Sequence, residues 1–255
     1  MIDVNVNLSR WPCRRLLGDE PDGLVANLRK RNVTQAWAGT FDGVLHKDLS
    51  SANQRLARDC QRYGPGLLIP FGSVNPKLPD WQEDLRRCHE DYKMPGIRLH
   101  PNYHGYELKD SAFGELLHLA AARRLITQVA LRMEDERTQH PLMRVPPVEL
   151  SPLVDVIKSE RGARVVVLNW NALEDVETAQ KLASTGRVYF DISMLESVGG
   201  VARLAQAIPI EQVLFGSHYP LFYFESALLK VREAGLVDAE ARAVLEGNAR
   251  RLLGA

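Results

Sequence analysis

Cysteine is scarce in this sequence, and no two cysteines stand at a spacing that binds metal or forms a redox pair. The 255 residues include three cysteines, Cys13, Cys60 and Cys88, which are odd in number and far apart. Without a CxxC pair, neither a thiolate zinc site nor a dithiol redox motif is indicated. Cys60 and Cys88 fall on helical patterns, whereas Cys13 is expected in a loop after the first strand.

Long hydrophobic runs and an excess of charge of either sign are also lacking. No apolar run approaches the roughly 20 residues of a transmembrane helix, and no signal peptide is visible. Lysine plus arginine and aspartate plus glutamate total 32 each, so the formal net charge is zero. We therefore expect a cytoplasmic protein that binds neither membranes nor nucleic acid. A small molecule is the expected ligand, and a homo-oligomer is compatible with this composition.

A glycine-rich phosphate loop is missing after the first strand, where a doubly wound open sheet usually carries one. What recurs instead is a β-branched run followed by an amphipathic stretch of about ten to fifteen residues. This alternation predicts an α/β fold, a single (β/α)8 TIM barrel over residues 1–255 with a closing C-terminal helix. The predicted strands are Ile2–Val6, Gln35–Gly39, Gly66–Val74, Gly96–Leu99, Ile126–Leu131, Arg164–Leu168, Arg187–Asp191 and Gln212–Phe215. The predicted helices are Asp22–Arg31, Asp48–Tyr63, Trp81–Asp91, Ser111–Ala122, Leu150–Ser159, Leu173–Ser184, Val198–Ala207, Glu225–Ala234 and Ala239–Leu253.

Four short motifs stand at the ends of predicted strands or in the closing helix. Residues 2–7 read Ile-Asp-Val-Asn-Val-Asn, and residues 96–101 read Gly-Ile-Arg-Leu-His-Pro. Residues 215–220 read Phe-Gly-Ser-His-Tyr-Pro, and residues 247–252 read Gly-Asn-Ala-Arg-Arg-Leu. Because a barrel places its chemistry at the C-terminal ends of its strands, the first three motifs mark the expected site.

In this order and spacing, the motifs resemble those of the second amidohydrolase family. Its members typically have Ile-Asp-x-His-x-His on strand 1, Gly-x-Lys/Arg-Leu-His-Pro on strand 4 and Phe-Gly-Ser-Asp-Tyr-Pro on strand 8. The resemblance covers nearly the whole chain and implies a metal-dependent hydrolase barrel. In the family, the metal ligands are the two strand-1 histidines, one histidine on each of strands 5 and 6, and the strand-8 aspartate.

This sequence departs from the family where the metal would be held. Amide oxygens are poor zinc ligands, and one imidazole cannot hold a divalent ion against water. We therefore expect no metal and no other cofactor, and no metal-activated water. The residues at the matching places are Asn5, Asn7, Ala130 or Arg132, Asn169 and His218.

His218 is the expected catalytic residue, because imidazole can shuttle a proton without metal. The alternative is a hydrogen-bonding residue of an inactive barrel. The asparagines can bind a substrate carbonyl or one another, and an arginine can hold a carboxylate. Arg98 can instead be buried against Asp191, and Arg132 can pair with loop acids. The residues expected to bind substrate are Asn5, Asn7, Arg98, His100, Arg132, Asn169 and Asp191.

The sequence therefore predicts a hydrolase-like protein, without metal, that acts on or binds a small ester, lactone, amide or carboxylate in the barrel mouth. The alternative is a catalytically inactive barrel that serves as a metabolite-binding or protein-interaction module. A third possibility is that His100, His104, His140 and His218 form a new metal site. Aromatic residues near the strand ends suit either a flat ligand or a subunit interface. They are Trp11, Trp170, Tyr219, Phe222 and Tyr223.

Overall fold

The strands of this protein form one closed, parallel barrel. The computed structural model describes residues 1–171, 175–196 and 198–254. Eight strands pair in sequence order, each parallel to the next. The last strand closes against the first, because Val4 N donates to Phe215 O (2.9 Å) and Asn7 N donates to Tyr219 O (2.9 Å). The predicted (β/α)8 barrel is confirmed.

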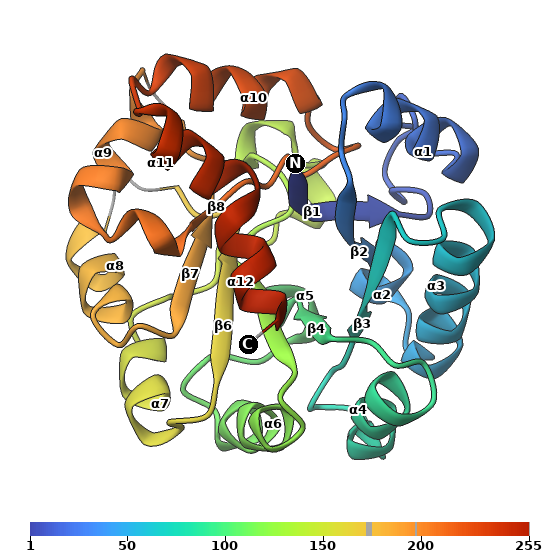
Figure 1. Ribbon diagram of the computed structural model, residues 1–255. Helices are drawn as coiled ribbons and strands as arrows, with labels where there is room; N and C mark the ends of the chain where they lie inside the picture. The colour runs from blue at the N-terminus through green and yellow to red at the C-terminus, as the bar shows by residue number, and fades with distance from the viewer. Residues whose placement is uncertain (172–174, 197, 255) are drawn as a thin grey trace.

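Buried strands alternate with outer helices along the chain, as the sequence pattern predicts (Figure 1). None of the described helices is long and apolar enough to cross a bilayer. The strands are β1 (Ile2–Leu8), β2 (Gln35–Thr40), β3 (Leu68–Ser73), β4 (Gly96–Leu99), β5 (Ile126–Ala130), β6 (Arg164–Leu168), β7 (Val188–Asp191) and β8 (Val213–Leu214). The outer helices are α1 (Pro21–Lys30), α3 (Leu49–Tyr63), α4 (Trp81–Glu90), α6 (Ser111–Ala122), α7 (Leu153–Ser159), α8 (Val176–Ala183), α9 (Gly200–Ala207) and α10 (Phe224–Glu233).

The structure differs from the sequence prediction at several helix ends. The helix predicted from Leu150 begins at Leu153, because proline at position 152 occupies the N-cap. The helix predicted from Leu173 starts outside the described residues, and α8 is seen from Val176, where the Asp175 side chain accepts from Thr178 N. Additional short elements are α2 (Asp42–Leu45), α5 (Pro101–His104), η1 (Glu136–Thr138), η2 (Pro141–Met143) and η3 (Ile210–Gln212).

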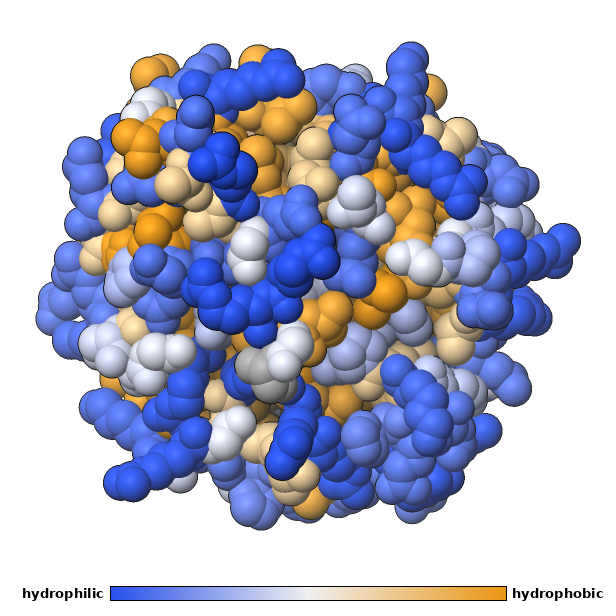
Figure 2. Space-filling model, viewed as in Figure 1, coloured by the Kyte–Doolittle hydropathy of each residue, from blue (hydrophilic) through white to orange (hydrophobic). Residues whose placement is uncertain are grey.

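The predicted closing helix is three segments that cover the N-terminal end of the barrel. They are α11 (Asp238–Arg242), a π-helical turn η4 (Ala243–Gly247) and α12 (Asn248–Gly254). In Figure 1 this end faces the viewer, with α12 across its centre, and hydrophilic side chains run over the same area in Figure 2. Asn248 anchors the turn, because its buried amide donates to Ile210 O (2.7 Å) and Val213 O (2.9 Å).

Inside the barrel, the guanidinium of Arg98 on β4 ties three other strands together. The residue is 1% exposed, and each of its five N–H groups has an acceptor at 2.8–3.3 Å. Burial lowers the pKa of Arg98 to about 10, which still leaves the group charged at neutral pH. The acceptors are the main-chain oxygens of Val4, Val6 and Trp37 and the side-chain oxygens of Asn7 and Gln128.

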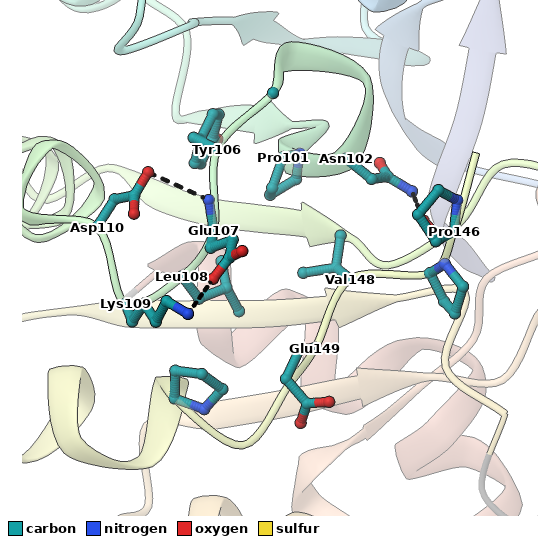
Figure 3. A pocket seen from close by; sticks show the side chains of 13 residues that line it. Pro101, Asn102, Tyr106, Glu107, Leu108, Lys109, Asp110, Pro146, Val148 and Glu149 are labelled. Atoms are coloured by element: carbon teal, nitrogen blue, oxygen red, sulfur yellow. Dashed lines mark hydrogen bonds and ion pairs between the residues drawn. The ribbon is translucent and has the colours of Figure 1, made fainter.

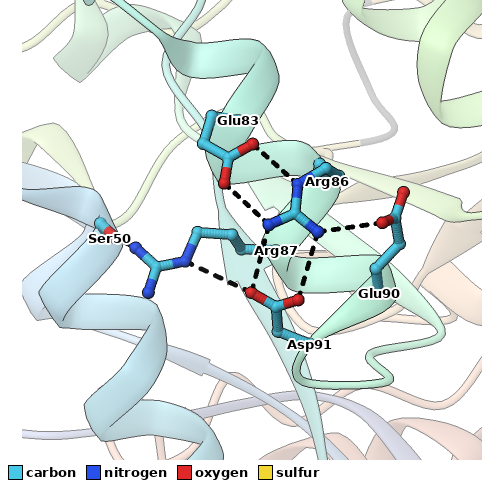
Figure 4. Close-up of polar contacts among 6 residues, drawn as sticks. All are labelled: Ser50, Glu83, Arg86, Arg87, Glu90 and Asp91. Atoms are coloured by element: carbon cyan, nitrogen blue, oxygen red, sulfur yellow. Dashed lines mark hydrogen bonds and ion pairs between the residues drawn. The ribbon is translucent and has the colours of Figure 1, made fainter.

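A second arginine makes as many polar contacts on the outside of the barrel. Arg86 on α4 bonds to Glu83, Glu90 and Asp91, and its neighbour Arg87 reaches Ser50 on α3 (Figure 4). The Arg86 side chain is 35% exposed, so water can replace its partners. Exposed ion pairs of this kind contribute little to stability. Arg86 is therefore a matched comparison for the buried Arg98.

We expect Arg98→Met to lower the free energy of unfolding by about 3–5 kcal/mol, because five buried acceptors lose their donors at once. Urea unfolding followed by circular dichroism measures this loss. Arg98→Lys, which keeps the charge but supplies fewer donors, should fall between the native protein and Arg98→Met. Arg86→Met should unfold close to the native midpoint, and equal losses at Arg86 and Arg98 would contradict this account.

Candidate functional site

Three asparagines and a histidine converge at the C-terminal end of the barrel, where the sequence predicts them. Asn5 Nδ2 donates to Asn169 Oδ1 (2.7 Å) and to Asp191 Oδ2 (2.8 Å). Asn7 Nδ2 lies 3.5 Å from His218 Nδ1, and Asn5 Oδ1 lies 3.4 Å from the same nitrogen. We call Asn5, Asn7, Asn169, Asp191 and His218 the amide–imidazole cluster. All five residues are at most 1% exposed.

Hydrogen bonding fixes the tautomer of His218. Its Nε2 lies 2.7 Å from the main-chain oxygen of Met133, which can only accept, so Nε2 carries the proton. Nδ1 therefore presents a lone pair to the Asn7 amide. Burial lowers the pKa of His218 to about 4, so the ring is neutral at neutral pH. If Nδ1 becomes protonated, Asn5 Oδ1 is placed to accept a hydrogen bond from it.

Asp191 at the end of β7 orients the amides of the cluster. Its carboxylate accepts from Asn5 Nδ2 and from Asn169 N (2.8 Å), which leaves Asn169 Oδ1 to accept from Asn5 and from Ser193 Oγ (2.9 Å). Burial raises the pKa of Asp191. Lys230 on α10 supports the same strand end, because its Nζ donates to Ser193 O (2.6 Å). None of the four sequence motifs includes Ser193 or Lys230, so the motifs did not predict these contacts.

Asp3 on β1 is a second buried carboxyl that the sequence prediction did not include. It accepts from Asn5 N (3.0 Å), from Ser217 N (3.0 Å) and from Ser217 Oγ (2.5 Å). Burial raises the pKa of Asp3 to about 7. Because Ser217 immediately precedes His218, Asp3 fixes both the Asn5 backbone and the start of the His218 turn. Strand alternation, which puts Asp3 on the same side as Asn5, was the available signal.

Asn169 and His218 share an unusual backbone conformation. Their φ angles are 59° and 57°, in the left-handed region that L-residues rarely adopt. Asparagine tolerates this region better than most residues, whereas histidine there costs some backbone strain. The two turns direct the Asn169 amide toward Arg132 O (2.6 Å) and the His218 ring toward Met133 O. The loop after β5 thus enters the cluster through its main chain.

The sequence-predicted His100 lies apart from these hydrogen bonds. It is 1% exposed, and neither of its ring nitrogens has a partner among the residues that the structure describes. The ring packs edge-on against His104, with centroids 5.8 Å apart, and His104 Nε2 donates to Gly43 O (3.0 Å). Burial holds the pKa of His100 well below its usual value and lowers that of His104 to about 4. His140 lies on the surface, where its Nδ1 accepts from Leu142 N (3.2 Å).

Apolar side chains on the loops after β1, β5 and β8 are also buried. Trp11, Met133 and Leu221 are 3%, 2% and 9% exposed and belong to one interior apolar group. Trp11 packs edge-on against Phe41, with centroids 5.3 Å apart. Arg14 on the β1 loop pairs with Glu134 on the β5 loop. His218 itself is 0% exposed, so a ligand reaches it only when these loops separate.

A cavity of about 320 Å³ adjoins the cluster at the ends of β5, β6 and β7. Arg132 and Asn171 line it, together with Asp135, Arg137 and Glu196. Among the described residues, Arg132 Nε and Asn171 Oδ1 are buried atoms without a hydrogen-bond partner. Arg132 thus has two roles, because its side chain faces this cavity and its carbonyl accepts from Asn169 in the cluster. By contrast, every N–H of Arg98 is bonded inside the barrel.

A larger cavity, of about 480 Å³, lies beside the barrel mouth between the loops after β4 and β5 (Figure 3). Several of its polar side chains are already paired, although the buried Tyr106 hydroxyl has no hydrogen-bond partner among the described residues. Asn102 Nδ2 donates to Pro146 O (2.9 Å), and Lys109 pairs with Glu107 (2.6 Å). Of the side chains that the sequence predicts to form the site, none lines this cavity in the described part of the chain. We therefore place the candidate site at the amide–imidazole cluster and its adjoining cavity.

The side chains of the cluster do not fit the divalent ion that the family typically holds. A metal needs several lone pairs that point to one position, but the Asn5 and Asn7 amides point N–H donors into the centre. The Asp191 carboxylate, the strongest donor for a metal, is already bonded to two N–H groups. Among the described residues, no group of three or more histidine, cysteine, aspartate and glutamate side chains is placed to hold a metal.

The two buried ionisable side chains His104 and Asp3 predict pH effects of opposite sign. The pKa of His104 is lowered to about 4, so its contribution to stability is lost as the pH falls from about 6.5 to 4. The pKa of Asp3 is raised to about 7, so its contribution is lost as the pH rises from about 4 to 7. His104→Gln should therefore make the slope of unfolding free energy against pH less positive, and Asp3→Asn should make it more positive. Urea unfolding between pH 4 and 7 measures both slopes, and a change of the same sign in the two variants contradicts these assignments.

Comparison with known proteins agrees with the resemblance carried by the motifs. The family model described as Amidohydrolase (Amidohydro_2) matches residues 14–255, which leaves the strand-1 motif outside the match. No curated protein matches the chain.

Solved structures of several enzymes share the fold at low sequence identity. A 2,6-dihydroxybenzoate decarboxylase from Rhizobium is 11% identical with a TM-score of 0.75, over 99% of this chain and 97% of that one. The 5-carboxyvanillate decarboxylase LigW from Sphingomonas paucimobilis is 13% identical with a TM-score of 0.75, over 100% and 98%. The 4-oxalomesaconate hydratase LigJ from Rhodopseudomonas palustris is 15% identical with a TM-score of 0.72, over 100% and 95%. At these identities the likeness establishes the barrel fold, and the family match decides the assignment: the chain belongs to the amidohydrolase family.

Proposed function

We propose that this chain is a hydrolase-like amidohydrolase-family barrel that works without a divalent ion and takes a small carbonyl compound at its mouth. The ligand class is a small ester, lactone, amide or carboxylate. The observation that carries the proposal is a pair of buried atoms, Arg132 Nε and Asn171 Oδ1, that have no partner within the described part of the chain and lie beside a cavity of about 320 Å³. A buried polar atom without a partner costs roughly 1–3 kcal/mol, and a ligand that pairs with it removes that cost.

The two atoms define which ligands fit. Arg132 Nε donates, so it takes a carbonyl or carboxylate oxygen, and Asn171 Oδ1 accepts, so it takes an N–H or O–H group. A compound that carries a carbonyl oxygen next to such a donor satisfies both. A solved structure with this fold, a 2,6-dihydroxybenzoate decarboxylase, is complexed with 2,6-dihydroxybenzoate, which is a hydroxylated carboxylate. This supports the same ligand class here.

In this proposal His218 is the proton acceptor for hydrolysis. Its Nδ1 takes a proton from water, the water oxygen adds to the ligand carbonyl, and the proton then passes to the departing alcohol. Asn5 Oδ1, 3.4 Å from Nδ1, stabilises the imidazolium while it exists. Because the pKa of His218 is only about 4, the imidazole is a weak base. Activated esters and lactones are therefore the substrates that suit it.

The second candidate is a non-catalytic barrel that binds a metabolite or a protein partner. The complete burial of His218 favours it, since the cluster satisfies its own hydrogen bonds. In that case the cluster is a structural replacement for the ion, and Arg132 binds the ligand without turnover. The two candidates share the ligand cavity and differ in whether His218 acts.

Thermal stabilisation by a panel of lactones, aryl esters, amides and small acids tests the ligand cavity that both candidates share. A fitting ligand at about 100 times its Kd should raise the Tm by roughly 5–10 °C. Arg132→Met should abolish the rise, because the ligand oxygen loses its donor. Arg58→Met, at a 65% exposed position on α3, is the control and should leave the rise intact. The proposed ligand cavity is contradicted if no compound raises the Tm, or if the rise in Tm is the same in Arg132→Met as in the native protein.

Turnover of the stabilising ligand separates the two candidates. His218→Asn keeps a residue that tolerates the left-handed backbone but removes the imidazole. If the barrel is an enzyme, this variant should still be stabilised by the ligand and should lose hydrolysis, as followed by chromatography of the products. Stabilisation without product in the native protein selects the non-catalytic barrel.

A further inference from the structure

The opposite, N-terminal end of the barrel carries a cavity with an unusual charge distribution. A cavity of about 280 Å³ lies where the loops before β4 and β5 meet the start of β6 and the end of α12. In Figure 1 this is the face toward the viewer. Within the described residues, its lining holds no acidic side chain, although the chain as a whole has a net charge of zero. The basic lining residues are His89, Lys93, Arg123, Arg124 and Arg164.

In the described part of the chain, the acidic side chains at the end of α4 do not neutralise this cavity. Glu90 and Asp91, at the end of α4, are bound to Arg86 on the outer surface (Figure 4). The C-terminal ends of α4 and α6 face the cavity, and each carries about half a negative charge. Two such ends offset about one of the charges of Lys93, Arg123 and Arg124, so the described lining stays positive. Burial lowers the pKa of Arg164, and the nearby charge of Arg124 lowers it further.

Two of these basic residues stand where glycine is the favoured residue. Lys93 has a φ of 53° and Arg124 a φ of 56°, both in the left-handed region at the end of an outer helix. Helices often end with glycine in this conformation, because a side chain there raises the backbone energy. Lys93 and Arg124 come from separate loops and line the same cavity. The two loops thus keep long cationic side chains at a conformational cost.

We infer that this cavity is an anion site for a phosphate group, as in a phosphate monoester or a diphosphate. Several cations that converge from separate loops suit a doubly charged group, and an arginine fork matches phosphate oxygens. The volume is near the lower end of ligand cavities, so the site takes the phosphate and leaves the rest of the ligand outside. Arg164 anchors the wall of the cavity, since its guanidinium donates to Leu252 O (2.9 Å) and to Arg124 O.

The phosphate can belong to a free metabolite or to a lipid headgroup, and the experiment distinguishes these sources. Pyrophosphate is titrated calorimetrically into the native protein and into the double variant Lys93→Gly/Arg124→Gly. Vesicles of phosphatidylcholine, with and without an anionic phospholipid, are sedimented with the same proteins. The double variant should bind at least about tenfold more weakly, because two charge-assisted contacts are lost. It should fold at least as well as the native protein, because glycine accepts both φ angles.

Two controls make the result specific. Asn32→Gly relieves another left-handed backbone position, with φ 58°, without a change of charge, and should bind as the native protein does. Arg58→Gln removes an exposed cation on α3 and should also have no effect. Binding of pyrophosphate that the double variant loses establishes a soluble ligand, and binding only to anionic vesicles that the variant loses establishes a headgroup. The inference is overturned if neither probe binds, if the double variant binds equally well, or if Arg58→Gln weakens binding as much.

Discussion

The buried guanidinium of Arg98 sets the direction of the hydrogen bonds at the centre of this barrel. Because it donates to Asn7 Oδ1, the Asn7 amide must present its N–H groups to His218 Nδ1. His218 then carries its proton on Nε2 and donates to Met133 O. At the other side, the Asp191 carboxylate fixes the direction of the Asn5 amide. The buried Arg98 guanidinium and the buried Asp191 carboxyl group thus orient the amides and the imidazole of the cluster.

In the function proposed here, directional hydrogen bonds take the place of the electrostatics of an ion. A divalent cation at the family's position stabilises negative charge in the barrel mouth and activates water. Here the amides supply weaker, neutral donors, and the imidazole is held uncharged by burial. Such a centre keeps the barrel end packed and polar without a metal, but it gives little electrophilic help. The proposed chemistry therefore depends on a ligand that reacts without electrophilic help.

The sequence predicted the fold and most of the cluster because both follow from short-range patterns. Alternating β-branched and amphipathic stretches predicted the eight strands, and the position at strand ends brought Asn5, Asn7, Asn169 and His218 together. The direction of Arg98 could not be predicted, since its acceptors are mostly main-chain oxygens that any residue supplies. The same reason hid Met133, whose carbonyl accepts a hydrogen bond from His218 Nε2. The left-handed backbone of Lys93 and Arg124 has no sequence signal, because glycine is the residue that marks such positions.

The central claim is that the amide–imidazole cluster stands in place of the metal, and metal content tests it most directly. Protein purified without chelator or affinity metal is incubated with zinc and with manganese, desalted and measured by elemental mass spectrometry. The account predicts less than about a tenth of an equivalent of either metal per chain. An intact metal site of this family would keep its ion through desalting, because such sites bind tightly. About one equivalent of zinc or manganese per chain contradicts it, because the cluster then binds the ion that its N–H donors should exclude.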